Sequence, residues 1–252
     1  MTSLTQKKFG AAAADYAASA VHAEGESLAR LVALVQPKPF WRLLDIATGA
    51  GHTALAFAPH VAKVTASDIT AEMLAETRRL AASRGLANVR TAEAKAEDLP
   101  FPDTSFDLVT CRLAAHHFRN PAAFVRESLR VLMPDGVFAL VDNIAPEDEA
   151  SARAYNAFEK LRDPSHRRCL SLKQWQTLIG GAGFELTHSE IMDQEIAFEP
   201  WVARMRCSDA TVALLKTRLG EAPLQELLRP RETDAGLAFT LREAILIARK
   251  PD

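Results

Sequence analysis

Short apolar runs alternate with helical repeats through the middle of the chain. The runs fall within residues 41–47, 61–68, 89–94, 106–112 and 136–143, and helical spacing occurs at residues 52–58, 71–83 and 121–132. Runs that are apolar on both faces are typical of buried parallel strands, and the helices between them supply the crossovers. The pattern therefore predicts an α/β fold with a doubly wound sheet covered by helices.

The two ends of the chain depart from this alternation. Residues 10–35 have the spacing of one or two amphipathic helices, broken near Gly25 and stopped by Pro37 and Pro39. The expected elements after the fifth strand are a polar segment at 146–168, a helix at 171–182, a strand at 184–192, a helical insertion near 200–228 and a last strand at 236–250. Two further strands bring the expected sheet to seven.

Composition narrows the choice of partners and location. The 252 residues include 30 Lys and Arg and 32 Asp and Glu, so the formal net charge is −2. Because the chain has no overall excess of positive charge, we do not expect a nucleic-acid partner. The apolar runs are too short for a membrane span. Three separate cysteines (Cys111, Cys169, Cys207) match no disulfide or metal-ligand spacing, so we expect no metal site and a cytoplasmic location. The oligomeric state is left open, a homodimer included.

A small-residue turn follows the first strand, in LLDIATGAGHTA at residues 43–54. Gly49 and Gly51 let the backbone approach a ligand closely. By itself the GAGHTA pattern also fits a dinucleotide site, or a turn that binds nothing. Asp45 precedes the glycines, where its carboxylate would repel a pyrophosphate and attract an ammonium group.

The next strands add the features that distinguish one ligand from another. Asp68 ends the second strand, where a carboxylate can accept both ribose hydroxyls. Ile69 and Met73 supply apolar surfaces for an adenine, and a loop at 96–101 returns to the same edge of the sheet. A ligand with an amine, a carboxylate, a ribose and an adenine fits these places better than NAD does. S-adenosylmethionine (SAM) is such a ligand.

At this point the chain resembles a known family, the class I SAM-dependent methyltransferases of the type 11 group, which includes the ubiquinone/menaquinone C-methyltransferases. The resemblance rests on LLDIATGAGHTA, SDITAEML, AEDLPFPDTSFDLVTCRLAAHHF and VLMPDGVFALVD. It implies a Rossmann-like, mostly parallel seven-stranded sheet with an antiparallel last strand. It also implies an N-terminal helical lid at residues 1–40 and a core at 41–252, with insertions at about 146–170 and 197–233 that form a substrate cap.

The resemblance also implies which residues hold the cofactor: Tyr16, Asp45, Ala47, Thr48, Gly49, Gly51, Asp68, Ile69, Met73, Ala96, Glu97 and Cys111. Two positions depart from the family pattern. Ala47 stands where many relatives carry glycine, which is acceptable if its φ is negative. Lys95 stands where many carry an aspartate, and lysine cannot accept a hydrogen bond from the adenine amino group. For Tyr16 two roles are open, closing over the methionine carboxylate or packing a helix on the core.

His116 and His117 follow the fourth strand, where reacting groups are expected in such a sheet. Methyl transfer from SAM is an in-line displacement, so a base is needed only when the nucleophile arrives protonated. Either imidazole could take that proton at neutral pH. The alternative is that one of the two histidines packs in the pocket wall and only the other touches substrate.

Four residues are candidates for acceptor binding: Arg112, His166, Trp201 and Arg204. Arg112 could orient an anionic acceptor or close an internal ion pair, and Arg204 could bind a carboxylate or lie solvated on the surface. The turn at 163–168 could cover the mouth of the site. Trp201 shares a helical face with Phe198 and Met205, and this face could form the cap core or a substrate cage.

The leading prediction is a methyltransferase that acts on a small-molecule acceptor. A SAM-binding protein without turnover remains an alternative because the sequence does not define an acceptor pocket. A nicotinamide-dependent oxidoreductase is a weaker alternative, since it uses the same glycine turn but no hydride-transfer constellation such as Tyr-x-x-x-Lys is evident.

Overall fold

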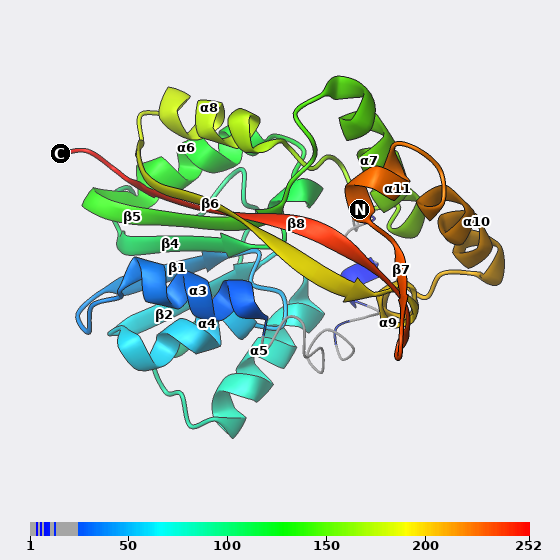
Figure 1. The fold of residues 1–252 in the computed structure, drawn as a ribbon. Helices are drawn as coiled ribbons and strands as arrows, with labels where there is room; N and C mark the ends of the chain where they lie inside the picture. Colours follow the sequence, from blue (N-terminus) through cyan, green and yellow to red (C-terminus); the bar gives the residue numbers. More distant parts are fainter. Residues whose placement is uncertain (1–3, 5, 7, 11–12, 14–24) are drawn as a thin grey trace.

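An eight-stranded sheet runs through the molecule (Figure 1). The computed structural model describes Leu4, Gln6, residues 8–10, Ala13 and residues 25–252. The strands are β1 (Arg42–Ile46), β2 (Lys63–Asp68), β3 (Val89–Glu93), β4 (Phe106–Arg112), β5 (Leu132–Asn143), β6 (Glu185–Ala197), β7 (Arg231–Thr233) and β8 (Gly236–Arg249). Their order is β3-β2-β1-β4-β5-β8-β6, and β7 pairs with β8 outside this path.

The predicted fold class is confirmed. The first five strands pair in parallel, and β8 runs antiparallel to β5, β6 and β7. The path has the seven expected strands, and β7 is an additional short strand that the sequence pattern did not indicate. It forms a tight hairpin with β8, in which the Thr233 hydroxyl donates to the carbonyl of Gly236.

Helices cover both faces of the sheet, as Figure 1 shows. They are α3 (Glu26–Val35), α4 (His52–Phe57), α5 (Ala71–Ser83), α6 (Pro121–Val131) and α8 (Leu172–Gly181). On one face Leu31 of α3 and Phe57 of α4 are fully buried, and on the other Phe124 of α6 and Trp175 of α8 are buried. Each such side chain stabilises the fold by about 1.5–3 kcal/mol relative to exposure.

The helix α3 begins after Gly25, as its sequence predicts, but it does not belong to a lid. Leu31 and Val35 pack into the core beneath β5 and β8. Residues 26–35 of the segment expected as a lid therefore pack on the sheet, and the lid role of the residues before Gly25 stays a prediction.

A separate group of helices lies beside β7, in the region where the substrate cap is expected. It comprises α7 (Glu149–Arg162), α9 (Phe198–Arg204), α10 (Asp209–Leu219) and α11 (Leu224–Leu228). The ring of Trp201 stacks on Phe158 at 5.4 Å and meets the ring of Phe239 edge-on at 4.9 Å. These three rings anchor a third hydrophobic core.

The helix α7 was expected only as a polar segment, and the structure corrects this. Asp148 caps its start by accepting from the amide of Ser151, and Tyr155 and Phe158 are buried one turn apart. The apolar stripe is narrow because most of the other side chains remain solvated. In the described part of the chain, the helices are each too short or too polar to cross a bilayer.

Candidate active site

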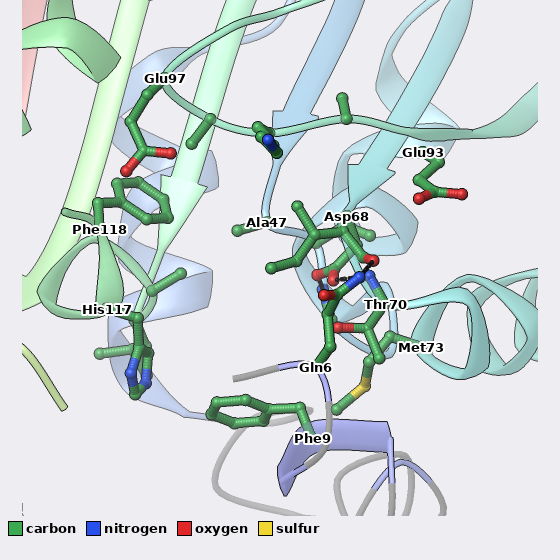
Figure 2. A pocket seen from close by; sticks show the side chains of 18 of the residues that line it. Gln6, Phe9, Ala47, Asp68, Thr70, Met73, Glu93, Glu97, His117 and Phe118 are labelled. Atoms are coloured by element: carbon green, nitrogen blue, oxygen red, sulfur yellow. Dashed lines mark hydrogen bonds between the residues drawn. The ribbon is translucent and has the colours of Figure 1, made fainter. Parts of the chain in front are cut away.

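A cavity of about 1170 Å³ opens at the carboxyl ends of β1, β2 and β4 (Figure 2). Strand order reverses between β1 and β4, and ligands bind at such a switch point in open α/β sheets. The cavity exceeds the usual range for one small ligand, roughly 300–1,000 Å³, so it has room for a cofactor and an acceptor together. Among the predicted site residues, those that line it are Ala47, Thr48, Gly49, Asp68, Ile69, Met73, Ala96, Glu97, Arg112 and His117.

Asp45 holds the turn after β1 from behind the cavity wall. Its carboxylate is buried and accepts from the hydroxyls of Thr48 at 2.5 Å and Thr110 at 2.7 Å. Burial raises the pKa of Asp45 to about 6, although the two hydroxyls and the charge of Arg112 lower it. Asp45 is not among the described residues that line the cavity. Its hydrogen bonds position the turn, and its predicted contact with the cofactor's ammonium group stays a prediction.

The φ angle of Ala47, in the turn after β1, differs from the expected negative value. It is +52°, in the left-handed region. A side chain at such an angle is strained by about 1–2 kcal/mol because Cβ approaches the following carbonyl. Leu113, at the end of β4, has a φ of +53° and lines the same cavity. Backbone strain of this kind is common at ligand sites.

Gly51 lies behind the wall, where only glycine fits. Its φ is +91°, and a Cβ there would lie 2.7 Å from Cγ2 of Thr77. The hydroxyl of Thr77 in turn donates to the carbonyl of Gly49 at 2.9 Å. Gly51 thus brings α5 against the turn, so its contribution to a cofactor site is indirect.

Asp68 lies between the turn and the segment that follows β2. Its carboxylate accepts from the amide of Gly49 at 2.9 Å and from the amide of Thr70 at 2.9 Å. Burial raises the pKa of Asp68, and the two amides partly offset this shift. In Figure 2, Asp68 lies beside Thr70 and near Met73, so a carboxylate and an apolar surface are adjacent.

The loop after β3 forms the opposite wall. Ala96 and Glu97 line the cavity, and Glu97 Oε1 accepts from the amide of Arg119 at 2.8 Å. Lys95 also lines it, where an aspartate acceptor would be expected in relatives. Cys111 is buried within β4 and is not among the described lining residues, and burial raises the pKa of its thiol.

The two histidines of η2 (Ala115–His117) have different surroundings. His117 lines the cavity, whereas His116 lies behind it with Nδ1 2.6 Å from Oδ1 of Asp142. Burial lowers the pKa of His116, but the charge and hydrogen bond of Asp142 outweigh it and raise the pKa above its ordinary value. Burial and the charge of His116 lower the pKa of His117 to about 3.

The nitrogen atoms of His117 face the turn at 163–168. Nδ1 lies 3.3 Å from the carbonyl oxygen of Ser165, and Nε2 lies 3.8 Å from Oδ2 of Asp163. A carbonyl oxygen only accepts, so a hydrogen bond there places the proton on Nδ1 and leaves Nε2 as the basic nitrogen.

The structure does not bring all acceptor candidates to the cavity. Arg112 lines it, with Nε 3.2 Å from the Thr53 hydroxyl. His166 is buried behind it, with Nε2 2.8 Å from Oδ1 of Asn156. Neither Trp201 nor Arg204 is among the described lining residues: Trp201 is packed in the cap core, and Arg204 lies at the end of α9. The expected Tyr16 contact lies outside the described residues.

Other lining residues were not predicted. Gln6 Nε2 donates to the carbonyl of Ile69 at 2.7 Å, and the ring of Phe9 lies edge-on to His117 at 5.0 Å. Figure 2 shows both side chains at the cavity. Their place depends on long-range folding, which local patterns do not encode. His52 and Phe118 also line the cavity, and each directly follows a predicted motif residue, Gly51 or His117.

The described residues fit SAM. The Asp68 carboxylate suits ribose hydroxyls, and Ile69 and Met73 beside it suit an adenine. At Gly49, φ is +55° and an added Cβ would meet nothing within 4 Å, so the glycine leaves open space in the cavity. The buried guanidinium of Arg112 supplies positive charge for a carboxylate.

Several known proteins with similar sequences and folds are named methyltransferases. A methyltransferase domain model matches residues 44–140. The uncharacterized methyltransferase YcgJ of Bacillus subtilis is 43% identical over 184 residues, which is 73% of each chain. Its crystal structure superposes with a TM-score of 0.84 over 90% of this chain and 98% of the other, at 35% identity. The ubiquinone/menaquinone biosynthesis C-methyltransferase UbiE of Pseudomonas putida is 36% identical over 121 residues, 46% of this chain and 47% of UbiE. The chain therefore belongs to the SAM-dependent methyltransferases.

Proposed function

We propose that this enzyme transfers the methyl group of SAM to a small-molecule acceptor by in-line displacement. The observation that carries the proposal is that one cavity includes both Gly49 and Asp68, which suit the cofactor, and His117, which faces the remaining space. Figure 2 shows Asp68 and His117 on different sides of this cavity. An acceptor bound beside His117 would therefore meet the methyl-bearing end of a cofactor bound at Gly49 and Asp68.

The cofactor supplies a methyl group on a cationic sulfur. The acceptor forms the new bond to this carbon, the carbon–sulfur bond breaks, and its electron pair stays on the sulfur of S-adenosylhomocysteine. Asp68 would bind the ribose, and Arg112 would bind the methionine carboxylate. Holding the two reactants in line supplies much of the rate.

His117 would take the proton of an acceptor that arrives protonated. Its low pKa keeps it neutral at physiological pH, so one ring nitrogen carries no proton and can accept one. A neutral hydroxyl becomes an oxonium and strongly acidic as the methyl bond forms, so even a weakly basic imidazole can accept its proton. His116 would act as a positioning residue, because its ring lies against His117 and it is not among the described lining residues. Asp142 would in turn position His116 through their hydrogen bond.

The beginning of the chain would close over the bound cofactor. Gln6 reaches the carbonyl of Ile69, and Phe9 lies against His117, so each links this segment to one side of the cavity. Hydrogen exchange around residues 4–13 should slow when S-adenosylhomocysteine is added. Equal exchange in both states would assign this segment a purely structural role.

The proposal is tested by a product screen with SAM labelled in its methyl group. Phenols, quinones, amines and carboxylic acids are offered as acceptors, and labelled product is sought by mass spectrometry. Calorimetry with SAM runs alongside. Tight SAM binding without transfer to any acceptor class would favour a binding protein without turnover. For an acceptor that is turned over, His117→Ala should lower kcat by roughly 10²–10⁴-fold if the histidine is the base.

A further inference from the structure

Charged residues line the cavity unevenly. Its acidic lining residues follow β2 and β3: Asp68, Glu93, Glu97 and Asp98. Its arginines follow β4 or come from the turn at 163–168: Arg112, Arg119 and Arg167. Lys95 is the described cation on the acidic side. Glu97 also reaches the side of the cavity near His117, beside Phe118, where it accepts from the amide of Arg119 (Figure 2). Arg112, Arg119 and Arg167 outnumber it there, so this side carries a net positive charge and favours an anionic ligand.

Arg167 is fixed at this wall by its backbone. The amides of Arg167 and Arg168 both donate to the carbonyl of His116, at 2.9 and 3.0 Å. The carbonyl of Ser165 lies 3.3 Å from Nδ1 of His117. The turn is thus attached to η2 at two points, and a preorganised turn loses little entropy when a ligand binds.

Nearby acids do not neutralise Arg167. Asp163, on the same turn, accepts from the amide and the hydroxyl of Ser165 at 2.8 and 2.7 Å. Glu97 accepts from the amide of Arg119. The side chain of Arg167 is exposed and forms no ion pair with the described residues, although it lines the cavity.

We infer that Arg167 binds an oxyanion of the methyl acceptor, a carboxylate or a phosphate, and so selects acidic acceptors. This inference rests on the proposed function. A guanidinium can donate two parallel hydrogen bonds to either group. Arg112 is buried against Thr53, nearer to the turn after β1, on the side where the cofactor is expected. Phe9 and Phe118 line the same cavity and would contact the apolar part of the acceptor.

The chain provides a matched control in the next residue. Arg168 has the same charge, is also exposed, and donates its amide to the same carbonyl, but it is not among the described lining residues. Arg167→Gln and Arg168→Gln therefore remove the same charge from the same turn. They differ only in whether the lost guanidinium faces the cavity.

The test measures binding of benzoate, phenyl phosphate and benzamide to the full chain loaded with S-adenosylhomocysteine. At least one of the two anions should bind about tenfold or more tighter than neutral benzamide, as expected for a charge-assisted hydrogen bond. Arg167→Gln should remove this preference, and Arg168→Gln should keep it. Which anion binds tighter distinguishes a carboxylate from a phosphate.

Three outcomes would overturn the inference. They are equal binding of the anions and benzamide, absence of anion binding, or equal losses in the two variants. A loss of S-adenosylhomocysteine affinity in Arg167→Gln would likewise assign the residue to the cofactor. The proposed function fails on a different measurement, because it requires cofactor binding and label transfer whichever acceptor class is preferred.

Discussion

Nδ1 of His116 lies 2.6 Å from Oδ1 of Asp142, directly behind the histidine that lines the cavity. Both side chains are almost fully excluded from water, so the pair is stable only while its charges compensate each other. His116 in turn lies 4.3 Å from His117, measured between ring centroids, and its positive charge lowers the pKa of His117. The protonation of a residue outside the cavity therefore influences the basicity of one inside it.

Asp142→Asn should lower the pKa of His116. The carboxylate is what raises it, by charge and by hydrogen bond, against the opposing effect of burial. Because folding raises the pKa of His116, protonated His116 stabilises the folded protein. This stabilisation is complete below the pKa of the unfolded state, about 6.5, and is lost as the pH rises through the pKa of the folded state. The variant should therefore lose more stability at about pH 6 than at about pH 9. Imidazole NMR titration and urea unfolding measure these effects, and an unchanged His116 titration would contradict the ion pair.

His166→Gln should weaken the acid sensitivity of the fold. Burial and the charge of His116 lower the pKa of His166 to about 2. Because folding lowers the pKa of His166, neutral His166 stabilises the folded protein. This stabilisation is complete above the pKa of the unfolded state, about 6.5, and is lost as the pH falls toward the pKa of the folded state. Without this histidine, the free energy of unfolding should rise less steeply with pH between about pH 3 and 6. The slope should be smaller by about 1.4 kcal/mol per pH unit. The exposed His60 provides a control, and a slope reduced equally in His60→Gln would refute the assignment.

Asp68→Asn should weaken binding of S-adenosylhomocysteine by about 10–100-fold, because a charge-assisted hydrogen bond to the ribose is lost. Asparagine keeps one oxygen that can accept from the amide of Gly49 or Thr70, so the fold should survive better than in Asp68→Ala. Calorimetry measures the affinity. Glu93→Gln, at the end of the neighbouring strand, is the control, and an equal loss there would move the ribose contact away from Asp68.

Gly51→Ala should destabilise the protein more than Gly49→Ala does. Both glycines have a positive φ, but only the added Cβ at residue 51 would clash, 2.7 Å from Cγ2 of Thr77. The difference should be about 1–3 kcal/mol, typical of overpacking. Thr77→Ser removes Cγ2, keeps the hydroxyl that donates to Gly49, and should restore part of the loss. Urea unfolding of the single and double variants measures this coupling, and additive losses would exclude the clash.

Local patterns predicted the regular core closely. The helix expected over residues 71–83 has those bounds, because its apolar positions repeat and Thr70 precedes it. The missed helix α7 has only a narrow apolar stripe, and that stripe packs on residues far away in sequence, such as Trp201, which lies 43 positions after Phe158. Helical periodicity is weak when so few positions are buried.

The part of the cavity beside Asp68 was more predictable than the part beside His117. Gly49, Asp68 and Ile69 follow strands, and the carboxyl ends of parallel strands meet at one edge. Phe9 and Arg167 come from distant segments whose place depends on how the cap and the start of the chain fold back. The positive φ of Ala47 was also not predicted, because alanine does not favour it and only the surrounding contacts maintain it.

Gly49 has both of its backbone polar groups held by side chains from elsewhere. Its amide donates to Asp68, 19 positions later, and its carbonyl accepts from Thr77, 28 positions later. The glycine motif alone, transplanted into another strand-turn-helix unit, would keep its sequence but lose the contacts that hold its backbone conformation. The recognition unit is therefore the whole stretch from β1 through α5, and a graft intended to carry the binding property must include that stretch.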